Sequence, residues 1–222
     1  MFQAAILDLD GLLIDSEPYW DRVVFERLAH LDVPAEALLP SETRGISVKE
    51  VVENYFKRYP WSGPDPQEVC IEIVSRVTDF IRREASIKPG VHELIQFFLA
   101  RRIPMAICSS SPISIIEAGI DRLGIANVLT LYHSAQNEKR GKPAPDVYLT
   151  TCRKLAVEPR AAIAFEDSPN GVRAAIDAGI CCVGVPDNGF PAEMIAHASC
   201  ILNSLEEFDE ERLVLLWNKQ SR

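Results

Sequence analysis

Apolar residues recur at two different spacings along the chain, and the change from one to the other falls near residue 87. From residue 16 to residue 86 they recur every three or four positions, which is the period of an amphipathic helix. This spacing predicts three helices and no strand, over 17–31, 47–59 and 66–84. In the last helix one apolar stripe is formed by Val69, Ile73, Val77, Phe80 and Ile81. Such a stripe is expected to pack within a small helical bundle.

Beyond residue 87, short apolar runs typical of strands alternate with helical stretches. The predicted strands are 103–108, 129–132, 161–165 and 181–185, and the predicted helices are 90–101, 112–123, 145–155, 169–178 and one near the end. Gly124 and Gly179 are expected to end the helices that precede them. Repeated strand–helix units form a parallel sheet with right-handed crossovers.

The mainly apolar run 2–7 predicts a further strand at the start of the chain. A lone strand is not stable beside helices, so this one must join the sheet. The helices that follow it are then an insertion, and Lys88-Pro89-Gly90 is expected to be the hinge where the chain returns. We therefore predict an α/β protein, with a Rossmann-like parallel-sheet core over 1–15 and 87–222 and an inserted α-helical domain over 16–86.

The composition fits either one core or a core with a small second domain. The chain has 222 residues, of which 47% are apolar and 25% are charged. Its net charge of −9 disfavours nucleic acid or anionic membrane as partners, so an anionic ligand would need a local positive site. No apolar run reaches the roughly 18 residues of a membrane span, and no basic stretch precedes an apolar one at the start. We expect a monomer in the cytoplasm.

Six cysteines are present, and none belongs to a CxxC pair. They are Cys70, Cys108, Cys152, Cys181, Cys182 and Cys200. Because several lie in apolar, strand-like runs, we expect reduced core residues rather than disulfides or a zinc site.

The strongest chemical signal follows the first strand, where Asp8 and Asp10 are two residues apart. Alternate residues of a strand share a face, so the two carboxylates should point the same way at its carboxyl end. Gly11 then allows the backbone to turn away. Two like charges held side by side cost free energy, which favours a divalent metal or a shared proton. An ordinary acidic loop is the alternative interpretation.

Three other loops are expected at the same edge, because ligands of open parallel sheets bind beyond the carboxyl ends of the strands. These loops carry Ser109-Ser110-Ser111, Lys142 and Glu166-Asp167-Ser168. A serine loop before a helix, together with a lysine, can hold the oxygens of a phosphate. The acids of the last loop, added to the first pair, bring four carboxylates to one crevice, which favours Mg²⁺.

Each loop also has a purely structural interpretation. Ser109 to Ser111 could cap the helix that follows them. Lys142 could be a solvated loop residue, although two prolines restrict its loop. Glu166 and Asp167 could favour the dipole of the next helix, with Ser168 as its cap.

The ordered set Asp8-x-Asp10, Ser109, Lys142 and Glu166-Asp167 resembles the four motifs of the haloacid dehalogenase superfamily, and the match spans the whole predicted core. The helical insertion is similar to the cap domain of the subgroup that contains β-phosphoglucomutase and the sugar phosphate phosphatases. Within that subgroup, residues 8–18 with Trp20-Asp21-Arg22 resemble hexitol and 2-deoxyglucose-6-phosphate phosphatases.

This resemblance implies a Mg²⁺-dependent phosphatase that hydrolyses small sugar or sugar-alcohol phosphate monoesters. Asp8 would attack phosphorus and form an aspartyl phosphate. Asp10 would protonate the leaving group and then take a proton from the attacking water. Ser109, the N–H of Ser110 and Lys142 would hold the phosphate oxygens.

The resemblance also implies the ligands of the metal. They would be the Asp8 side chain, the Asp10 carbonyl oxygen and Asp167, with Glu166 as a support or a water-mediated ligand. A cis peptide bond between Lys142 and Pro143 is implied as well.

Two other functions stay open at this point. A phosphomutase of the subgroup would have a cap histidine where this chain has Trp20, and an arginine where it has Val48 after Gly45-Ile46-Ser47. Without that arginine a second phosphate has no evident bidentate partner, so hydrolysis is favoured. A sugar phosphate-binding protein without catalysis is the other alternative, but it would not need Asp10.

Substrate specificity is expected to come from the cap. The candidates are Glu17, Trp20 and Arg44, and Gly45 could approach the ligand through its backbone. Trp20 offers a flat apolar face to a sugar ring or an alkyl chain, or it is simply packed between cap helices.

Overall fold

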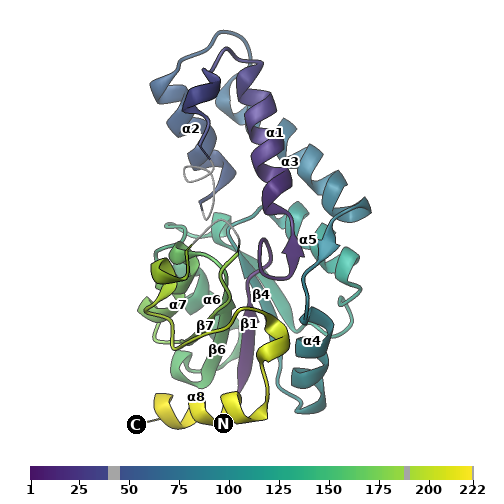
Figure 1. Cartoon of the computed structure of the whole chain (residues 1–222), viewed down its shortest axis with the longest axis vertical. Coiled ribbons are helices and arrows are strands. Elements are labelled where there is room, and N and C mark those ends of the chain that lie inside the picture. The colour runs from purple at the N-terminus through teal and green to yellow at the C-terminus, as the bar shows by residue number, and fades with distance from the viewer. Residues whose placement is uncertain (40–45, 188–190, 222) are drawn as a thin grey trace.

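A parallel sheet flanked by helices forms the lower half of the molecule, and a bundle of three helices stands above it (Figure 1). The computed structural model describes residues 1–39, 46–187 and 191–221. Both marked ends of the chain lie at the bottom, on the side of the sheet away from the bundle. The chain therefore starts in the sheet, builds the bundle and returns to the sheet.

Within the described residues the main sheet has six strands, and all of its pairings are parallel. Its order is β5-β4-β1-β6-β7-β8, with β1 Ala4–Leu7, β4 Met105–Ser109, β5 Leu131–Ser134, β6 Ala162–Glu166, β7 Cys181–Gly184 and β8 Cys200–Ile201. The first strand lies in the middle, where Leu7 is opposite both Ile107 and Phe165. The predicted α/β class and the place of the first strand in the sheet are confirmed.

Helices cover both faces of this sheet (Figure 1). Helices α6 Asp146–Leu155 and α7 Pro169–Asp177 lie on one side, α4 Val91–Ala100 and α5 Ile113–Leu123 on the other, and α8 Glu210–Gln220 crosses the bottom. Successive side chains of β1 point to opposite faces of the sheet. Ile6 belongs to the apolar cluster of α6 and α7, whereas Leu7 belongs to the cluster of α4 and α5. The continuous apolar run of β1 thus follows from its burial on both sides.

The insertion consists of α1 Glu17–Ala29, α2 Val48–Arg58 and α3 Pro66–Arg83, as its spacing predicts. Capping boxes start α2 at Ser47 and α3 at Asp65. The apolar stripe of α3 is buried at Val69, Ile73, Val77 and Ile81. Phe80 is only half-buried and stacks on the ring of Tyr19 in α1, with ring centroids 3.8 Å apart. Each fully buried side chain of this kind stabilises the bundle by roughly 1.5–3 kcal/mol.

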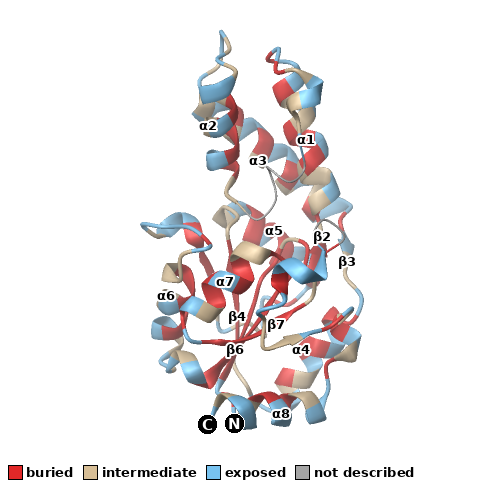
Figure 2. Cartoon of the chain, turned by 60° about the vertical axis from the view of Figure 1, so that its left-hand side comes forward, coloured by how far each residue is buried: buried red, intermediate tan, exposed pale blue. Residues whose placement is uncertain are grey.

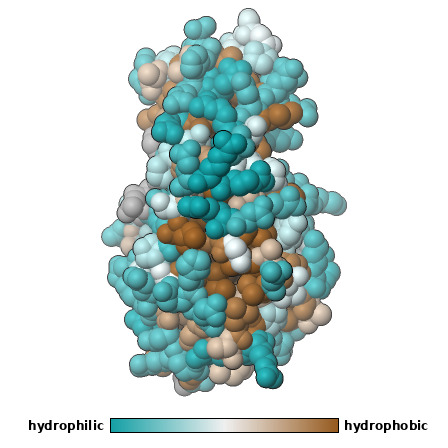
Figure 3. Space-filling view, turned by 90° about the vertical axis from the view of Figure 1, so that its right-hand side faces the viewer, coloured by the Kyte–Doolittle hydropathy of each residue, from teal (hydrophilic) through white to brown (hydrophobic). Residues whose placement is uncertain are grey.

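The outer surface of the insertion is mostly polar, although Ile71 of α3 is exposed. Figure 2 shows its buried residues on the inner sides of the three helices and exposed residues outside. In Figure 3 the insertion is mainly hydrophilic, and apolar surface gathers lower down, on the sheet half of the molecule.

Two ion pairs cross from α1 to α3, between Arg27 and Glu72 at 2.5 Å and between Arg76 and Glu26 at 2.6 Å.

One short antiparallel pair was not predicted by the hydrophobic pattern. Strand β2 Ile14–Asp15 pairs with β3 Ser86–Ile87, at the two points where the chain leaves the sheet half and returns to it. A strand of two residues is too short to show alternation, so the expectation of a strand-free segment is wrong at its last residue.

The pattern also missed the shortest elements elsewhere. They are β8 and the 3-10 helices η1 Ala35–Ala37, η3 Ala135–Asn137, η4 Pro159–Ala161, η5 Ala192–Ile195 and η6 Leu205–Glu207. Predicted strands 103–108 and 129–132 lie slightly later in the structure, at β4 and β5.

The segment expected to be the return hinge is tied down at several points. The Lys88 N–H donates to the carbonyl of Leu13 at 3.0 Å, and its Nζ lies 2.7 Å from Asp187 Oδ1. Gly90 follows with φ of +80°, and a Cβ there would lie 2.3 Å from the backbone nitrogen of Glu206. Only glycine fits this turn, because both the backbone angle and the neighbouring chain exclude a side chain.

The six cysteines are all free, as expected for reduced residues. Cys108, Cys152, Cys181 and Cys182 are buried, whereas Cys70 and Cys200 are half-buried, so the prediction of core positions is wrong for these two. Among the described residues, no helix has both the length and the apolar character that crossing a membrane requires.

Replacing Gly90 by alanine is expected to destabilise the protein by about 2–5 kcal/mol, because left-handed strain of about 1–2 kcal/mol adds to overpacking of about 1–3 kcal/mol. Gly124→Ala is the matched control. Gly124 ends α5 as predicted, with φ of +68°, but nothing lies within 4 Å of its Cβ position. It should therefore show the strain alone, about 1–2 kcal/mol. Urea unfolding of both variants measures the difference, and equal losses would contradict the contact with Glu206.

Candidate active site

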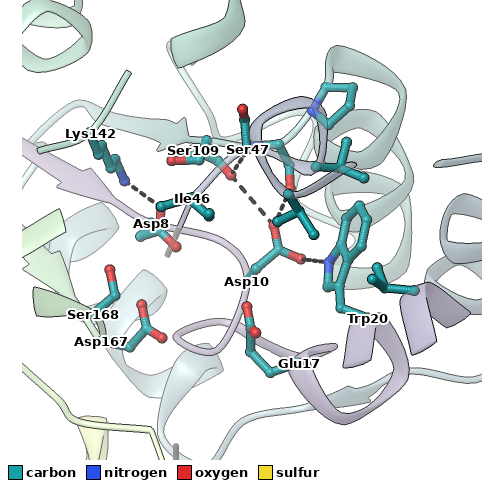
Figure 4. A pocket seen from close by; sticks show the side chains of 16 residues that line it. Asp8, Asp10, Glu17, Trp20, Ile46, Ser47, Ser109, Lys142, Asp167 and Ser168 are labelled. Atoms are coloured by element: carbon teal, nitrogen blue, oxygen red, sulfur yellow. Dashed lines mark hydrogen bonds and ion pairs between the residues drawn. The ribbon is translucent and has the colours of Figure 1, made fainter. Parts of the chain in front are cut away.

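Four loops meet at the carboxyl end of the sheet and form one pocket beneath the insertion (Figure 4). The sequence-predicted residues Asp8, Asp10, Ser109, Ser110, Lys142 and Asp167 all line it. Glu17 and Trp20 of α1 and the start of α2 near Ser47 form the wall on the side of the insertion. The pocket is therefore built from both parts of the chain.

Lys142 is buried at the base of this pocket, with 5% of its surface exposed. Its Nζ donates to Asp8 Oδ1 at 2.6 Å, to Glu166 Oε1 at 2.5 Å and to the carbonyl of Cys108 at 3.0 Å. An ammonium group has three protons, and all three are used. The interpretation of Lys142 as a solvated loop residue is wrong.

The charge of Lys142 is stabilised in this environment. Burial lowers its pKa, but the carboxylates of Asp8 and Glu166 raise it, and the net result is a pKa well above the usual value. Lys142 is therefore a fixed positive charge at neutral pH. The bond between Lys142 and Pro143 is cis, as the resemblance implies.

Three buried carboxylates lie together here, and Lys142 contacts two of them, Asp8 and Glu166. Ligand oxygens of Asp8, Glu166 and Asp167 lie within 4.8 Å of one another. Burial raises the pKa of Asp8 to about 7, Lys142 opposes this, and Glu166 and Asp10 add to it. Burial, followed by the charges of Asp8 and Glu166, raises the pKa of Asp167 well above its usual value. One lysine does not neutralise three carboxylates, so the cluster fits a divalent cation with oxygen ligands.

The Glu166 carboxylate in this cluster already accepts hydrogen bonds from two donors. Its Oε1 accepts from Lys142 and, at 2.5 Å, from the hydroxyl of Tyr148 in α6. A Cβ on Gly171 would lie 1.8 Å from Glu166 Oε2, so glycine is needed to let the carboxylate pack against the start of α7. These contacts agree with a supporting position beside the lysine.

Tyr148 is a site residue that the sequence analysis missed. It is fully buried, and burial followed by the charge of Glu166 raises the pKa of its hydroxyl well above the usual value, so it stays a donor. In the sequence it belongs to the apolar stripe of a helix. The available signal was its hydroxyl, since a buried tyrosine usually has a hydrogen-bond partner.

Asp10 lies in the same pocket but outside the carboxylate cluster. Its Oδ1 accepts from Ser16 Oγ at 2.6 Å and from Trp20 Nε1 at 3.1 Å. Its Oδ2 accepts from Ser111 Oγ at 2.7 Å, and Ser109 Oγ lies 3.5 Å away. The contacts to Trp20 and to the serine loop are drawn in Figure 4.

The serine loop does not cap the helix that follows it. Helix α5 has Pro112 at its N-cap, without a side-chain bond, and Ser109 Oγ instead accepts from the N–H of Ser111 at 3.0 Å. The capping interpretation of these serines is wrong. Ser168 does cap α7, because its Oγ accepts from the N–H of Gly171 at 3.1 Å.

The loop after β1 has the conformation that its glycine suggests. Gly11 has φ of +76°, and a Cβ there would lie 2.2 Å from Asp167 Oδ2. Asp8 follows the last residue of β1 rather than lying in the strand, so loop geometry and not strand alternation sets the direction of the two acids.

The specificity candidates lie in different parts of the chain. Glu17 and Trp20 line the pocket, and Trp20 also packs against the main apolar cluster, which spans the insertion and one face of the sheet. Trp20 therefore does both: its side chain packs against apolar neighbours and also forms part of the pocket wall. Arg44 and Gly45 lie outside the described residues.

Comparison with known proteins gives one family and several relatives. The family model described as haloacid dehalogenase-like hydrolase matches residues 2–179. Hexitol phosphatase B from Escherichia coli is 35% identical over 185 residues, which are 82% of this chain and 83% of that protein. Validoxylamine A 7'-phosphate phosphatase from Streptomyces hygroscopicus subsp. limoneus is 33% identical over 208 residues, 93% of this chain and 96% of that protein.

A solved structure shares the fold. β-Phosphoglucomutase from Clostridium difficile matches with a TM-score of 0.81 and 24% identity, covering 99% of this chain and 98% of that one.

Tyr148→Phe is expected to lower the free energy of unfolding by roughly 1.5–3 kcal/mol, because a buried hydrogen bond to a charged carboxylate is lost. Tyr132→Phe is the matched control, since the Tyr132 hydroxyl also donates to a glutamate, Glu117, at 2.8 Å, but at the surface. That variant should change stability by no more than about 0.5 kcal/mol. Urea unfolding compares the two, and similar effects would contradict the buried Tyr148–Glu166 contact.

Proposed function

The chain belongs to the haloacid dehalogenase-like hydrolase family, as its motifs predict, and we propose that it is a Mg²⁺-dependent phosphatase of small sugar or sugar-alcohol phosphate monoesters. Membership of this family and the phosphatases among its relatives make it a phosphoric monoester hydrolase. The metal, the mechanism and the substrate are the parts that we propose.

The contact between Lys142 and Asp8 carries this proposal. Asp8 Oδ1 is 2.6 Å from a buried ammonium, in a pocket that also contains Asp10 and Ser109. A carboxylate, a fixed cation and a second acid within one pocket are the groups that phosphoryl transfer through a covalent intermediate requires.

In the first step we propose that an Asp8 oxygen attacks phosphorus. The bond from phosphorus to the oxygen of the substrate breaks, and Asp10 donates a proton to that oxygen, which leaves as an alcohol. The Ser109 hydroxyl and the N–H of Ser110 hold the phosphoryl oxygens as their charge redistributes, and the fixed positive charge of Lys142 beside Asp8 stabilises that charge. The product of this step is a phosphoryl group on Asp8.

In the second step Asp10, now ionised, accepts a proton from water while the water oxygen attacks phosphorus. The bond between Asp8 and phosphorus breaks, and inorganic phosphate is released. Asp10 is protonated again, so both acids return to their starting states.

The acidic cluster supports Mg²⁺ as the cofactor. Asp8 and Asp167 would hold the ion through their side chains and Asp10 through its carbonyl oxygen, while Glu166 stays with Lys142 and Tyr148. When bound, Mg²⁺ neutralises charge between the nucleophile and the phosphate.

The substrate class follows from the relatives and from the pocket charge. Hexitol phosphatase B is among the relatives, and among the described residues of the pocket the one basic side chain is Lys142. Val48 also lines this pocket, at the position where a phosphomutase of the subgroup would have an arginine for a second phosphate, which favours hydrolysis. The placement of Asp10 likewise favours catalysis over binding alone.

We also propose that the two parts of the chain have different roles. Residues 1–15 and 87–222 form the catalytic core, and residues 16–86 form a cap whose Glu17 and Trp20 face the substrate. The net charge of −9 favours a small phosphorylated metabolite over nucleic acid. Cytoplasmic location and a monomeric state stay predictions from the sequence.

Asp8→Asn is expected to abolish phosphate release, because an amide is not a nucleophile towards phosphorus. The assay is release of inorganic phosphate from hexitol phosphates, 2-deoxyglucose 6-phosphate and glycerol phosphate, with Mg²⁺ or with a chelator. Asp177→Asn is the control, since Asp177 pairs with Arg173 on the surface of α7.

Release that requires both Mg²⁺ and Asp8, and is kept in the control, is the expected result. Interconversion of sugar phosphate isomers with a bisphosphate primer, without net release, would support the phosphomutase instead. Substrate binding with neither activity would support the binding protein.

Mg²⁺ affinity is expected to fall as the pH decreases below about 7. The pKa of Asp8 is raised to about 7, so at lower pH the carboxyl binds a proton that the metal must displace. Each proton released changes the affinity by about tenfold per pH unit. Titration calorimetry at pH 6 and pH 8 in buffers of different ionisation enthalpy measures this release. An affinity independent of pH over this range would contradict the raised pKa.

A further inference from the structure

A groove opens directly from the proposed phosphate pocket. One of its walls is formed by α2 and α3 of the insertion, and the other by the serine loop and the segment 135–142 between β5 and α6. Five residues line both the pocket and the groove, namely Ser47, Val48, Ser110, Pro112 and Lys142. A ligand whose phosphate lies in the pocket can therefore extend into the groove.

The two cavities differ greatly in size. The pocket has a volume of about 70 Å³, which is room for about five water-sized groups, and so for a phosphate and little more. The groove has a volume of about 1320 Å³, above the roughly 300–1,000 Å³ that is usual for a small-molecule site. The alcohol part of a substrate has to extend into the groove, which has more room than a single sugar needs.

The lining of the groove is partly apolar and partly polar. Ile71, which is 61% exposed, and Val74 are one turn apart on the face of α3 that lines it. The same groove has exposed polar side chains at Ser75, Gln136 and Lys139. A sugar ring has apolar C–H faces and polar hydroxyl groups at its edge, so it suits an apolar surface with polar neighbours.

The charges along the groove limit which alcohol it accepts. Lys142 is already paired with Asp8 and Glu166. Apart from this lysine, the described residues that line the groove include five carboxylates and three cations. A second phosphate or a carboxylate on the substrate would be repelled by this excess of negative charge. The groove therefore favours an alcohol without charge.

The loop that forms the core wall of the groove is held at several points. The Ser134 hydroxyl accepts from the N–H of Gln136 at 3.1 Å and donates to the carbonyl of Ser111 at 2.6 Å. Two residues further on, Glu138 Oε1 lies 2.6 Å from Nε2 of the buried His133. A wall that is already ordered costs little conformational entropy when a ligand binds against it.

From the size and lining of this groove we propose that the protein also hydrolyses phosphate monoesters of neutral, disaccharide-sized alcohols, and that the segment 135–142 takes part in recognising them. The inference rests on the proposed phosphatase function, because the phosphate is bound and transferred at the same site. The bond from phosphorus to the sugar oxygen breaks, one water is consumed, and the disaccharide and inorganic phosphate are released. Specificity would then depend on the sheet half of the molecule as well as on the insertion.

The test compares trehalose 6-phosphate, the disaccharide-sized probe, with a hexitol phosphate. Ser75→Trp places a large side chain in the groove, since Ser75 is an exposed residue of its α3 wall. Arg83→Trp is the matched control, because Arg83 is also exposed on α3 but lies outside the residues that line the groove. Both kcat and KM are measured on each substrate by release of inorganic phosphate.

A second pair of variants tests the core wall. Gln136→Ala removes an exposed amide from the groove, and Arg140→Ala is its control. Arg140 belongs to the same loop but pairs with Asp146 outside the groove lining, with 2.7 Å between Nη2 and Oδ2.

We expect the wild type to hydrolyse trehalose 6-phosphate with a kcat/KM within about 3-fold of that on the hexitol phosphate, or higher, because the groove has room for both alcohols. Ser75→Trp should lower the ratio of kcat/KM on trehalose 6-phosphate to kcat/KM on the hexitol phosphate by about 10- to 100-fold, mainly through KM. Gln136→Ala should lower this ratio by about 2- to 10-fold, the effect of one hydrogen bond. Both control variants should leave the ratio unchanged.

A wild type that releases phosphate from the hexitol phosphate but not from trehalose 6-phosphate would overturn the inference and leave the proposed function intact. An unchanged ratio in both Ser75→Trp and Gln136→Ala would overturn it as well, since the disaccharide would then lie outside the groove. A wild type without activity on either substrate would instead contradict the proposed function itself.

Discussion

Burial of Lys142 among carboxylates is the constraint on which the rest of the site depends. A buried ammonium is tolerated only when its charge is paired and its protons are accepted. Asp8, Glu166 and the carbonyl of Cys108 meet this need, and they come from the ends of three neighbouring strands, β1, β6 and β4. Loops far apart in the sequence are thereby joined at one point, and the excess of negative charge that remains is what a divalent cation would balance.

The two acids of the first loop differ because their surroundings differ. Asp8 lies in a buried, charged environment that raises its pKa to about 7, whereas Asp10 receives hydrogen bonds from hydroxyl groups and an indole. Carboxyl groups in unlike environments can take unlike roles, which is how related pairs in other enzymes divide nucleophilic and acid–base work. The insertion contributes to this difference, since two donors to Asp10 come from the start of α1.

Regular periodicity predicted most of the fold. The alternation of apolar strands and helices was long enough to predict the parallel sheet, and the stripe of α3 predicted the bundle. Strands β2 and β3 were missed because two residues carry no pattern.

The convergence of Asp8, Lys142 and Asp167 could be predicted because strand ends meet at one edge. The contacts of Tyr148 and Ser111 could not be predicted, because they depend on which side chain lies opposite each residue after folding. In the sequence, Tyr148 fits an apolar stripe and Ser111 fits a helix cap.

The most direct test of this account is to identify the residue that carries the phosphoryl group. Acid quenching during turnover of a hexitol phosphate, followed by peptide mass spectrometry, would detect a phosphorylated aspartate. We predict the phosphoryl group on Asp8 and none on Asp10. A larger amount should be trapped in Asp10→Asn on para-nitrophenyl phosphate, because hydrolysis of the intermediate then lacks its base. Phosphate release by an active wild type without any phosphoryl group on Asp8, or with one on Asp10, would contradict it.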